Sequence, residues 1–156
     1  MNPPFFIGPF APGFRVPPGD RKALSTDEFI YKLLFAENKV DTPPTGFVDV
    51  RDVAIALVKG QKTSGRHRIV LGGEWFTLGE AIEYIASIHP ELKGRLATAS
   101  PTAQKNSLLD NSKAALVLGL TPRSWKESVR DGVDDLLKME RSWIAQGIEV
   151  KATGFY

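Results

Sequence analysis

The sequence predicts a single α/β domain that combines short strands with amphipathic helices. The chain has 156 residues, of which 42% are hydrophobic and 24% charged, as is usual for a globular domain with its own core. Short apolar runs at Phe5–Ile7, Phe47–Val48 and His67–Leu71 are bounded by turn residues, which favours strands. The capping-box pattern, a hydroxyl residue followed three positions later by glutamate, precedes three amphipathic stretches and indicates helix starts.

The first strand is expected within residues 1–18, a segment rich in proline, glycine and phenylalanine. The run Phe5–Ile7 is apolar without alternation, which is typical of a strand covered on both faces in a parallel sheet. Such a strand needs a neighbour on each side. We therefore expect residues Asn2–Gly8 either to join a homo-oligomer or to form a mobile segment.

The three capping boxes lie at residues 25–28, 77–80 and 124–127, and each precedes apolar residues at helical spacing. A fourth helix is expected from Val50 to Lys59, with Asp49 as its N-cap and Gly60 as its stop. A short fifth helix is expected over Ser112–Leu118, before Gly119. Each helix should bury one apolar stripe.

The charge pattern disfavours nucleic acid as a partner. Lysine and arginine total 20 against 18 acidic residues, and the two signs alternate along the chain. There is no cysteine, which fits a reducing compartment and excludes thiolate chemistry. Residues 1–12 contain prolines and no basic region, so neither a signal peptide nor a membrane span is expected. The preferred location is cytoplasmic.

Patterns that carry chemistry are scarce. His67 and His89 have no partner at metal-ligand spacing, so no metal site is predicted, and His89 is expected to end a helix. Gly72 and Gly73 follow a strand but lack the third glycine of a dinucleotide loop. Two carboxylate pairs are expected to serve as caps or solvated surface groups rather than as acids or bases; they are Asp49 with Asp52, and Asp134 with Asp135.

Three separated motifs carry a family resemblance. They are residues 2–9 (NPPFFIGP), 47–54 (FVDVRDVA) and 118–123 (LGLTPR). In this order they resemble the extended short-chain dehydrogenase/reductases of the epimerase/dehydratase superfamily, in particular the methylglyoxal and carbonyl reductases related to dihydroflavonol and cinnamoyl-CoA reductases. The resemblance implies a partial Rossmann-type C-terminal region, with residues 1–156 as one substrate-side domain and residues 147–156 as a tail.

The same resemblance implies a function for a longer protein, NAD(P)H-dependent reduction of an aldehyde or ketone. The glycine-rich loop, the catalytic serine and the Tyr-x-x-x-Lys pair of that family are not in this sequence. Tyr31 is followed directly by Lys32, and Tyr84 has no lysine four residues on. No catalytic residue is therefore assigned, and the chain alone is expected to be inactive.

By resemblance, Pro3, Pro4, Phe5 and Phe6 would lie along the nicotinamide, and Phe5 would face the substrate. The alternative is that these residues are only a buried strand and its entry. Ser25 lies near a position that can contact the cofactor phosphate. Its capping-box interpretation is complete without a ligand.

The remaining implied substrate residues are aromatic or basic. Phe10, Phe14 and Phe29 would line an apolar pocket, with ordinary core packing as the alternative. Arg51 resembles a residue that approaches a substrate phosphate in sugar-nucleotide relatives. The alternative is a local ion pair with Asp52.

Cofactor and partners also follow from the resemblance. The full-length family uses NADP or NAD, and this chain is expected to bind neither tightly, because it lacks a pyrophosphate cradle. A small carbonyl compound is the implied substrate. The alternative function is a non-catalytic binding or regulatory module that pairs with a full-length reductase or with itself.

Overall fold

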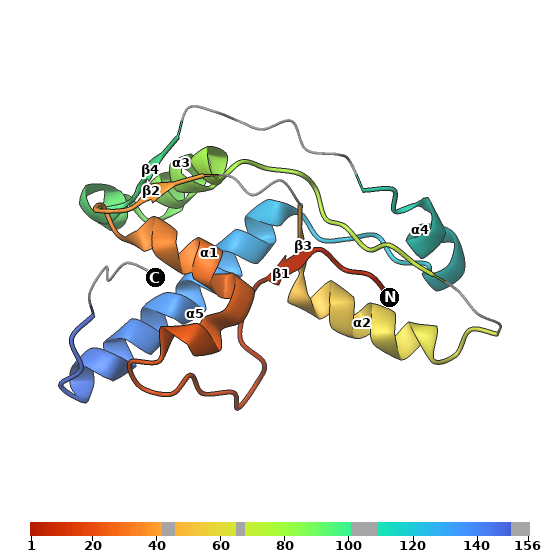
Figure 1. Cartoon of the computed structure of the whole chain (residues 1–156), viewed down its shortest axis with the longest axis horizontal. Coiled ribbons are helices and arrows are strands. Elements are labelled where there is room, and N and C mark those ends of the chain that lie inside the picture. The colour runs from red at the N-terminus through yellow and green to blue at the C-terminus, as the bar shows by residue number, and fades with distance from the viewer. Residues whose placement is uncertain (42–45, 65–67, 101–108, 151–156) are drawn as a thin grey trace.

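The structure is a computed structural model that describes residues 1–41, 46–64, 68–100 and 109–150. The chain combines short strands with helices, as expected (Figure 1). In chain order the elements are β1 (Phe5–Ile7), the 3-10 helix η1 (Arg21–Asp27), α1 (Glu28–Tyr31), the 3-10 helix η2 (Lys32–Leu34), β2 (Lys39–Val40), β3 (Phe47–Asp49), α2 (Val50–Gly60), α3 (Leu78–Ile88), the 3-10 helix η3 (Pro90–Arg95), β4 (Thr98–Ala99), α4 (Ser112–Leu118) and α5 (Trp125–Ala145).

The strands form two small parallel pairs. β1 pairs with β3, with Phe5 opposite Phe47 and Ile7 opposite Asp49, and β2 pairs with β4. The third apolar run makes only an isolated parallel bridge, from Val70 to Asn2, and His67 lies outside the described residues. Within the described chain, β3 is the only strand beside β1.

The expectation that β1 is covered on both faces is wrong for one residue. Ile7 is buried, whereas Phe6 is 39% exposed. The two side chains point to opposite faces because side chains alternate along a strand. The elements that pack on Ile7 therefore leave the face of Phe6 open.

Local turn chemistry explains where the confirmed helices begin and end. At α3 both halves of the capping box are present, with Glu80 N–H donating to Thr77 Oγ1 at 3.0 Å and Thr77 N–H donating to Glu80 Oε2 at 2.7 Å. Asp49 caps α2 by accepting from Arg51 N–H at 2.7 Å. Gly119 ends α4 with φ of 54°, a left-handed conformation that glycine adopts without strain.

The capping box expected at Ser124 is wrong, although α5 begins where it was predicted. Ser124 Oγ donates to Glu74 Oε2 at 2.9 Å and makes no side-chain cap. Glu127 instead lies 3.3 Å from Arg123 Nε. Glu74 and Arg123, which lie outside α5, thus replace the capping contacts expected within it. The helix is stabilised by its buried apolar side chains.

Two apolar cores lie on either side of the β1–β3 pair. The larger core joins the strand pair to α1, α3 and α5, and its fully buried side chains include Ile7, Leu33 and Val133. The smaller core includes Val48, Ala56 and Leu118 and joins β3 to α2 and α4. Figure 1 shows the two helix groups on opposite sides of the strands.

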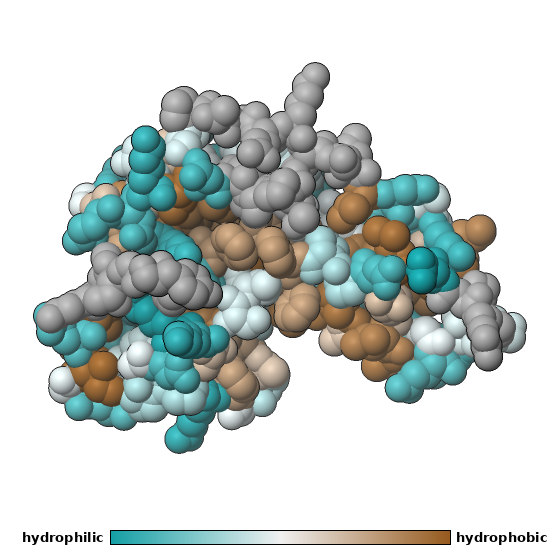
Figure 2. Space-filling model, viewed as in Figure 1, coloured by the Kyte–Doolittle hydropathy of each residue, from teal (hydrophilic) through white to brown (hydrophobic). Residues whose placement is uncertain are grey.

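Apolar side chains also reach the surface. Ile55, Leu57 and Val58 of α2 are exposed, and Figure 2 shows apolar residues over the central strands and over α2. In the described part of the chain, no helix is both long and apolar enough to cross a membrane.

Candidate functional site

The segment expected along the nicotinamide lies where β1 begins. Pro3, Pro4 and Phe5 are half-buried and Phe6 is exposed, directly after the bridge at Asn2. Asn2 N–H donates to Ile69 O at 2.8 Å, which ties this segment to the chain after α2. The segment is thus held in place while the open face of β1 remains accessible.

The end of β1 is held by side chains of η1. Thr26 Oγ1 donates to the Phe6 carbonyl, and Asp27 Oδ1 accepts from Gly8 N–H at 3.0 Å. These contacts explain why the capping box predicted at Ser25 is wrong. Ser25 is exposed, has φ of 52°, and lies inside the kinked η1 rather than at a cap.

Asp27 is a polar group that the sequence patterns did not single out. Burial raises the pKa of its carboxyl to about 7, the Gly8 N–H lowers it, and the nearby Asp49 and Asp135 carboxylates raise it again. Desolvation and two like charges disfavour the ionised form. Only the three-dimensional neighbours of Asp27 distinguish it from the other acidic residues of the chain.

Phe5 and Phe29 come together at the start of an aromatic cluster. Their ring centroids are 5.0 Å apart, and both rings contact Phe47, at 6.2 and 5.8 Å. The cluster continues from Phe47 to Phe76 and then to Trp125. Phe5 and Phe29 therefore contribute to the core as well as to the region where β1 begins.

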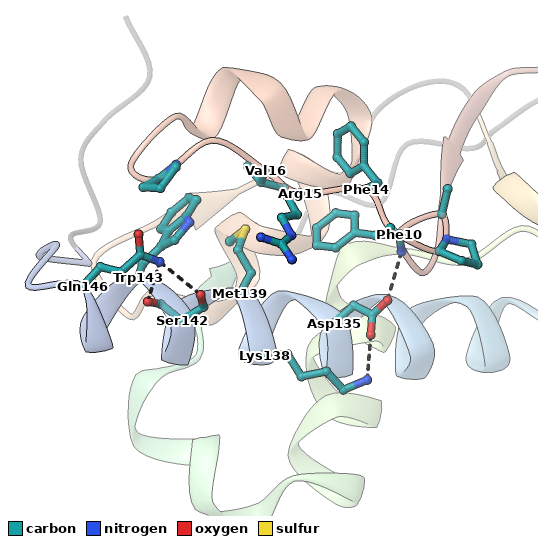
Figure 3. A pocket seen from close by; sticks show the side chains of 14 residues that line it. Phe10, Phe14, Arg15, Val16, Asp135, Lys138, Met139, Ser142, Trp143 and Gln146 are labelled. Carbon is teal, nitrogen blue, oxygen red and sulfur yellow. Dashed lines mark hydrogen bonds and ion pairs between the residues drawn. The ribbon is translucent and has the colours of Figure 1, made fainter.

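Phe10 and Phe14 lie at a different place, in a pocket between residues 10–18 and α5 (Figure 3). The pocket volume is about 790 Å³, and the two rings are 5.9 Å apart. Asp135 of α5 accepts from Phe10 N–H at 3.0 Å. The phenylalanines expected to form one pocket thus divide between two sites.

Arg51 is paired, but not with Asp52 as expected. Its guanidinium lies 2.7 Å from Asp49 Oδ2 and 2.7 Å from Asp131 Oδ2, and these hydrogen bonds raise its pKa. Asp52, which is buried, pairs with Arg123 and accepts its N–H at 2.7 Å. The cap expected at Asp49 is confirmed, whereas a solvated role is wrong for Asp52, whose carboxylate is buried against Arg123.

The histidine expected to end a helix does so. His89 is the C-cap of α3 and lies within 3.0 Å of Glu91 and 3.2 Å of Asp134. Among the described residues, no group of three or more His, Cys, Asp or Glu side chains could hold a metal ion.

The class of this protein follows from three features. They are the parallel strand pairs, the motifs at residues 2–9 and 47–54, and the helices packed around them. The chain belongs to the extended short-chain dehydrogenase/reductases, as a fragment that spans about 43% of the length of the relatives described next. No family model matches the chain.

Individual relatives are reductases. The chain is 34% identical over 151 residues to the NADPH-dependent methylglyoxal reductase of Saccharomyces cerevisiae and 32% identical over 149 residues to a ketoreductase of Aspergillus niger. These matches cover 90% and 88% of the chain but 43% of each relative. The crystal structure of Gre2 from Candida albicans in complex with NADPH superposes with a TM-score of 0.74 at 25% identity, covering 88% of this chain and 43% of that one.

Proposed function

We propose that this chain is the substrate-binding portion of an NAD(P)H-dependent carbonyl reductase that acts on a small aldehyde or ketone. The observation that carries the proposal is the 34% identity to an NADPH-dependent reductase over 90% of this chain. We further propose a cytosolic location, in keeping with a sequence that contains no cysteine.

In this proposal the start of β1 meets the nicotinamide end of the cofactor. NAD(P)H supplies the hydride when it is bound. The open face of β1, with Phe6 exposed and Pro3 and Pro4 half-buried, would be the surface that a flat ring contacts. Ser25 is exposed and its hydroxyl is not used in a cap, which leaves it available to a phosphate.

On the substrate side, Phe5 and Phe29 would form the wall next to the reacting carbonyl, and Phe10 and Phe14 would bound a second, outer pocket. Arg51 is left out of the substrate site, because Asp49 and Asp131 occupy its guanidinium.

The chain carries no suitable proton donor of the family's tyrosine type at Tyr31. This side chain is fully buried, and burial, together with the Glu140 carboxylate, raises its pKa. General acid catalysis requires a group within hydrogen-bond reach of the substrate. We therefore propose that the chain alone does not oxidise NAD(P)H with aldehydes. We also propose that it binds the cofactor only weakly, because it lacks a glycine-rich loop for the pyrophosphate.

A chimera tests this function. The matching part of the Saccharomyces cerevisiae reductase is replaced by this chain, and NADPH oxidation is followed with small and bulky carbonyl compounds. We expect turnover in the chimera and none above the blank for the chain alone. A correctly folded chimera that binds NADPH but reduces no carbonyl compound would refute the proposal.

Within the chimera, Phe5→Ala is expected to change kcat/KM for bulky relative to small ketones by about tenfold, with little change in NADPH affinity. Loss of an aromatic wall changes how well large substrates fit. Equal losses for all substrates would show that Phe5 serves the core only.

The alternative function is a non-catalytic module that pairs through β1 with a second copy or with a full-length reductase. The observation that favours it is the open side of β1, where β3 is the only neighbouring strand among the described residues and Phe6 is 39% exposed. Thr26 and Asp27 already bond the Phe6 carbonyl and the Gly8 N–H, so the pairing would bury the exposed Phe6 side chain rather than add a strand to β1.

Light scattering tests this pairing. If the chain self-associates through β1, Phe6→Lys should convert the assembly to monomers, because burying a lysine ammonium group in an apolar interface is unfavourable. Leu116→Lys is the matched control, since Leu116 is 86% exposed on α4. A monomeric wild-type chain, or equal effects of both substitutions, would exclude self-association by this edge.

A further inference from the structure

We infer that the pocket between residues 10–18 and α5 binds a ligand with an apolar, ring-containing body and a single carboxylate, held by Arg15. This inference rests on the proposed function and deepens it, because it names the class of ligand that the outer pocket of Phe10 and Phe14 takes. The described lining comes from residues 10–18 and from the α5 side, so binding can be measured on this chain without NADPH.

The size and lining of the pocket suit a small organic molecule. Its volume of about 790 Å³ lies within the roughly 300–1,000 Å³ range of ligand sites. The apolar walls come from Phe10 and Phe14 on the loop and from Met139 and Trp143 on α5. Trp143 is almost fully buried and Phe14 is 52% exposed, so the pocket has a fixed floor and an open rim.

The charged side chains that line the pocket determine which ligand charge the pocket favours. Lys138 lies 2.8 Å from Asp135 Oδ1, so these two charges cancel, and Asp135 also accepts from Phe10 N–H. No described residue forms an ion pair or hydrogen bond with Arg15. Figure 3 shows the Arg15 side chain extending from the loop toward α5, into the pocket. The lining thus carries one uncompensated positive charge.

One guanidinium favours a carboxylate over other anions. Its planar fork donates two parallel hydrogen bonds that match the geometry of a carboxylate, and one positive charge balances one negative charge. A phosphate ester carries more charge than a single arginine neutralises. Ser142 and Gln146 hydrogen-bond to each other at 3.2 Å and add neutral donors near the C-terminal end of α5.

The probes are 1-naphthylacetate and its neutral analogue 1-naphthylacetamide, titrated into the ¹⁵N-labelled chain and followed by amide shifts. We expect the acid to perturb residues 10–18 and the 135–146 part of α5, and the amide to bind about fivefold more weakly. Equal affinity for the two probes, no binding of the acid, or shifts centred elsewhere would overturn the inference.

Variants separate the charge from the apolar wall. Arg15→Gln should weaken the acid about fivefold and leave the amide unchanged, whereas Phe14→Ala should weaken both. Arg141→Gln is the matched control, because Arg141 is an exposed cation on α5, the helix that forms one wall of the pocket, but is not itself part of the pocket lining. If Arg141→Gln weakens the acid as much as Arg15→Gln does, general attraction rather than the pocket is responsible, and the inference fails. Since cofactor and turnover play no part in these measurements, their outcome is independent of the chimera experiment.

Discussion

Replacing Asp49 by alanine is expected to lower the free energy of unfolding by about 3–5 kcal/mol, because it removes a buried carboxylate that caps α2 and accepts hydrogen bonds from Arg51 and Ser128. The Asp49 carboxylate is fully buried. It accepts from Arg51 N–H at 2.7 Å and Arg51 Nε at 2.9 Å, and from Ser128 Oγ at 2.7 Å. One side chain thereby caps α2 and joins β3 to α5.

The measurement is urea unfolding of Asp49→Ala beside Glu127→Ala. Glu127 is 41% exposed and lies 3.7 Å from the same guanidinium, so its removal should cost less than about 1 kcal/mol. Similar losses in the two variants would show that burial of Asp49 contributes nothing beyond a surface pair.

The same contact predicts the response to acid. Burial raises the pKa of the Asp49 carboxyl, but hydrogen bonds from Arg51 and Ser128 outweigh burial and hold this pKa below its usual value. A lowered folded-state pKa stabilises the fold above the unfolded pKa of about 3.9, and this stabilisation is lost as the pH falls through the folded pKa. The difference between wild type and Asp49→Asn should therefore shrink below about pH 4.

Local chemistry predicted helix positions better than it predicted helix caps. The same hydroxyl-x-x-Glu pattern occurs at Ser25, Thr77 and Ser124, yet only Thr77 forms the full box. At Ser124 the hydroxyl binds Glu74, 50 residues away in sequence. The hydroxyl-x-x-Glu pattern predicts the local hydrogen-bond partner of Ser124. It does not reveal a distant residue such as Glu74 that takes the place of that partner.

The candidate site shows the same limit. The resemblance correctly indicated the family, the apolar run Phe5–Ile7 gave the position of the first strand, and Asp49 was predicted as a cap from its neighbours alone. Phe10 and Phe14 were expected to line a pocket, but its wall on α5 was not predictable, because Phe10 and Asp135 lie 125 residues apart and α5 was interpreted only as a core helix. Likewise, the pairing of Arg51 with Asp131 spans 80 residues, while the sequence offered the adjacent Asp52.

Asp27→Asn is expected to stabilise the protein, and by more at pH 8 than at pH 4.5. Burial raises the pKa of Asp27 from 3.8 to about 7, so the unfolded chain ionises this carboxyl at lower pH than the folded one does. The contribution of the neutral carboxyl is complete below about pH 4 and is lost as the pH rises to about 7. Asparagine has no charge to desolvate and retains an oxygen that can accept from Gly8 N–H.

The interval from 3.8 to about 7 corresponds to about 4 kcal/mol, and the solvent access that Asp27 retains lowers the expected gain at pH 8 to about 2 kcal/mol. Asp20→Asn is the matched control; it removes an exposed carboxylate of the same segment and should change stability by less than about 0.5 kcal/mol at either pH. Urea unfolding of the three proteins at the two pH values measures the difference. A gain in Asp27→Asn that does not depend on pH would mean that Asp27 is ionised throughout, and that the Gly8 N–H, rather than burial and the neighbouring carboxylates, sets its charge.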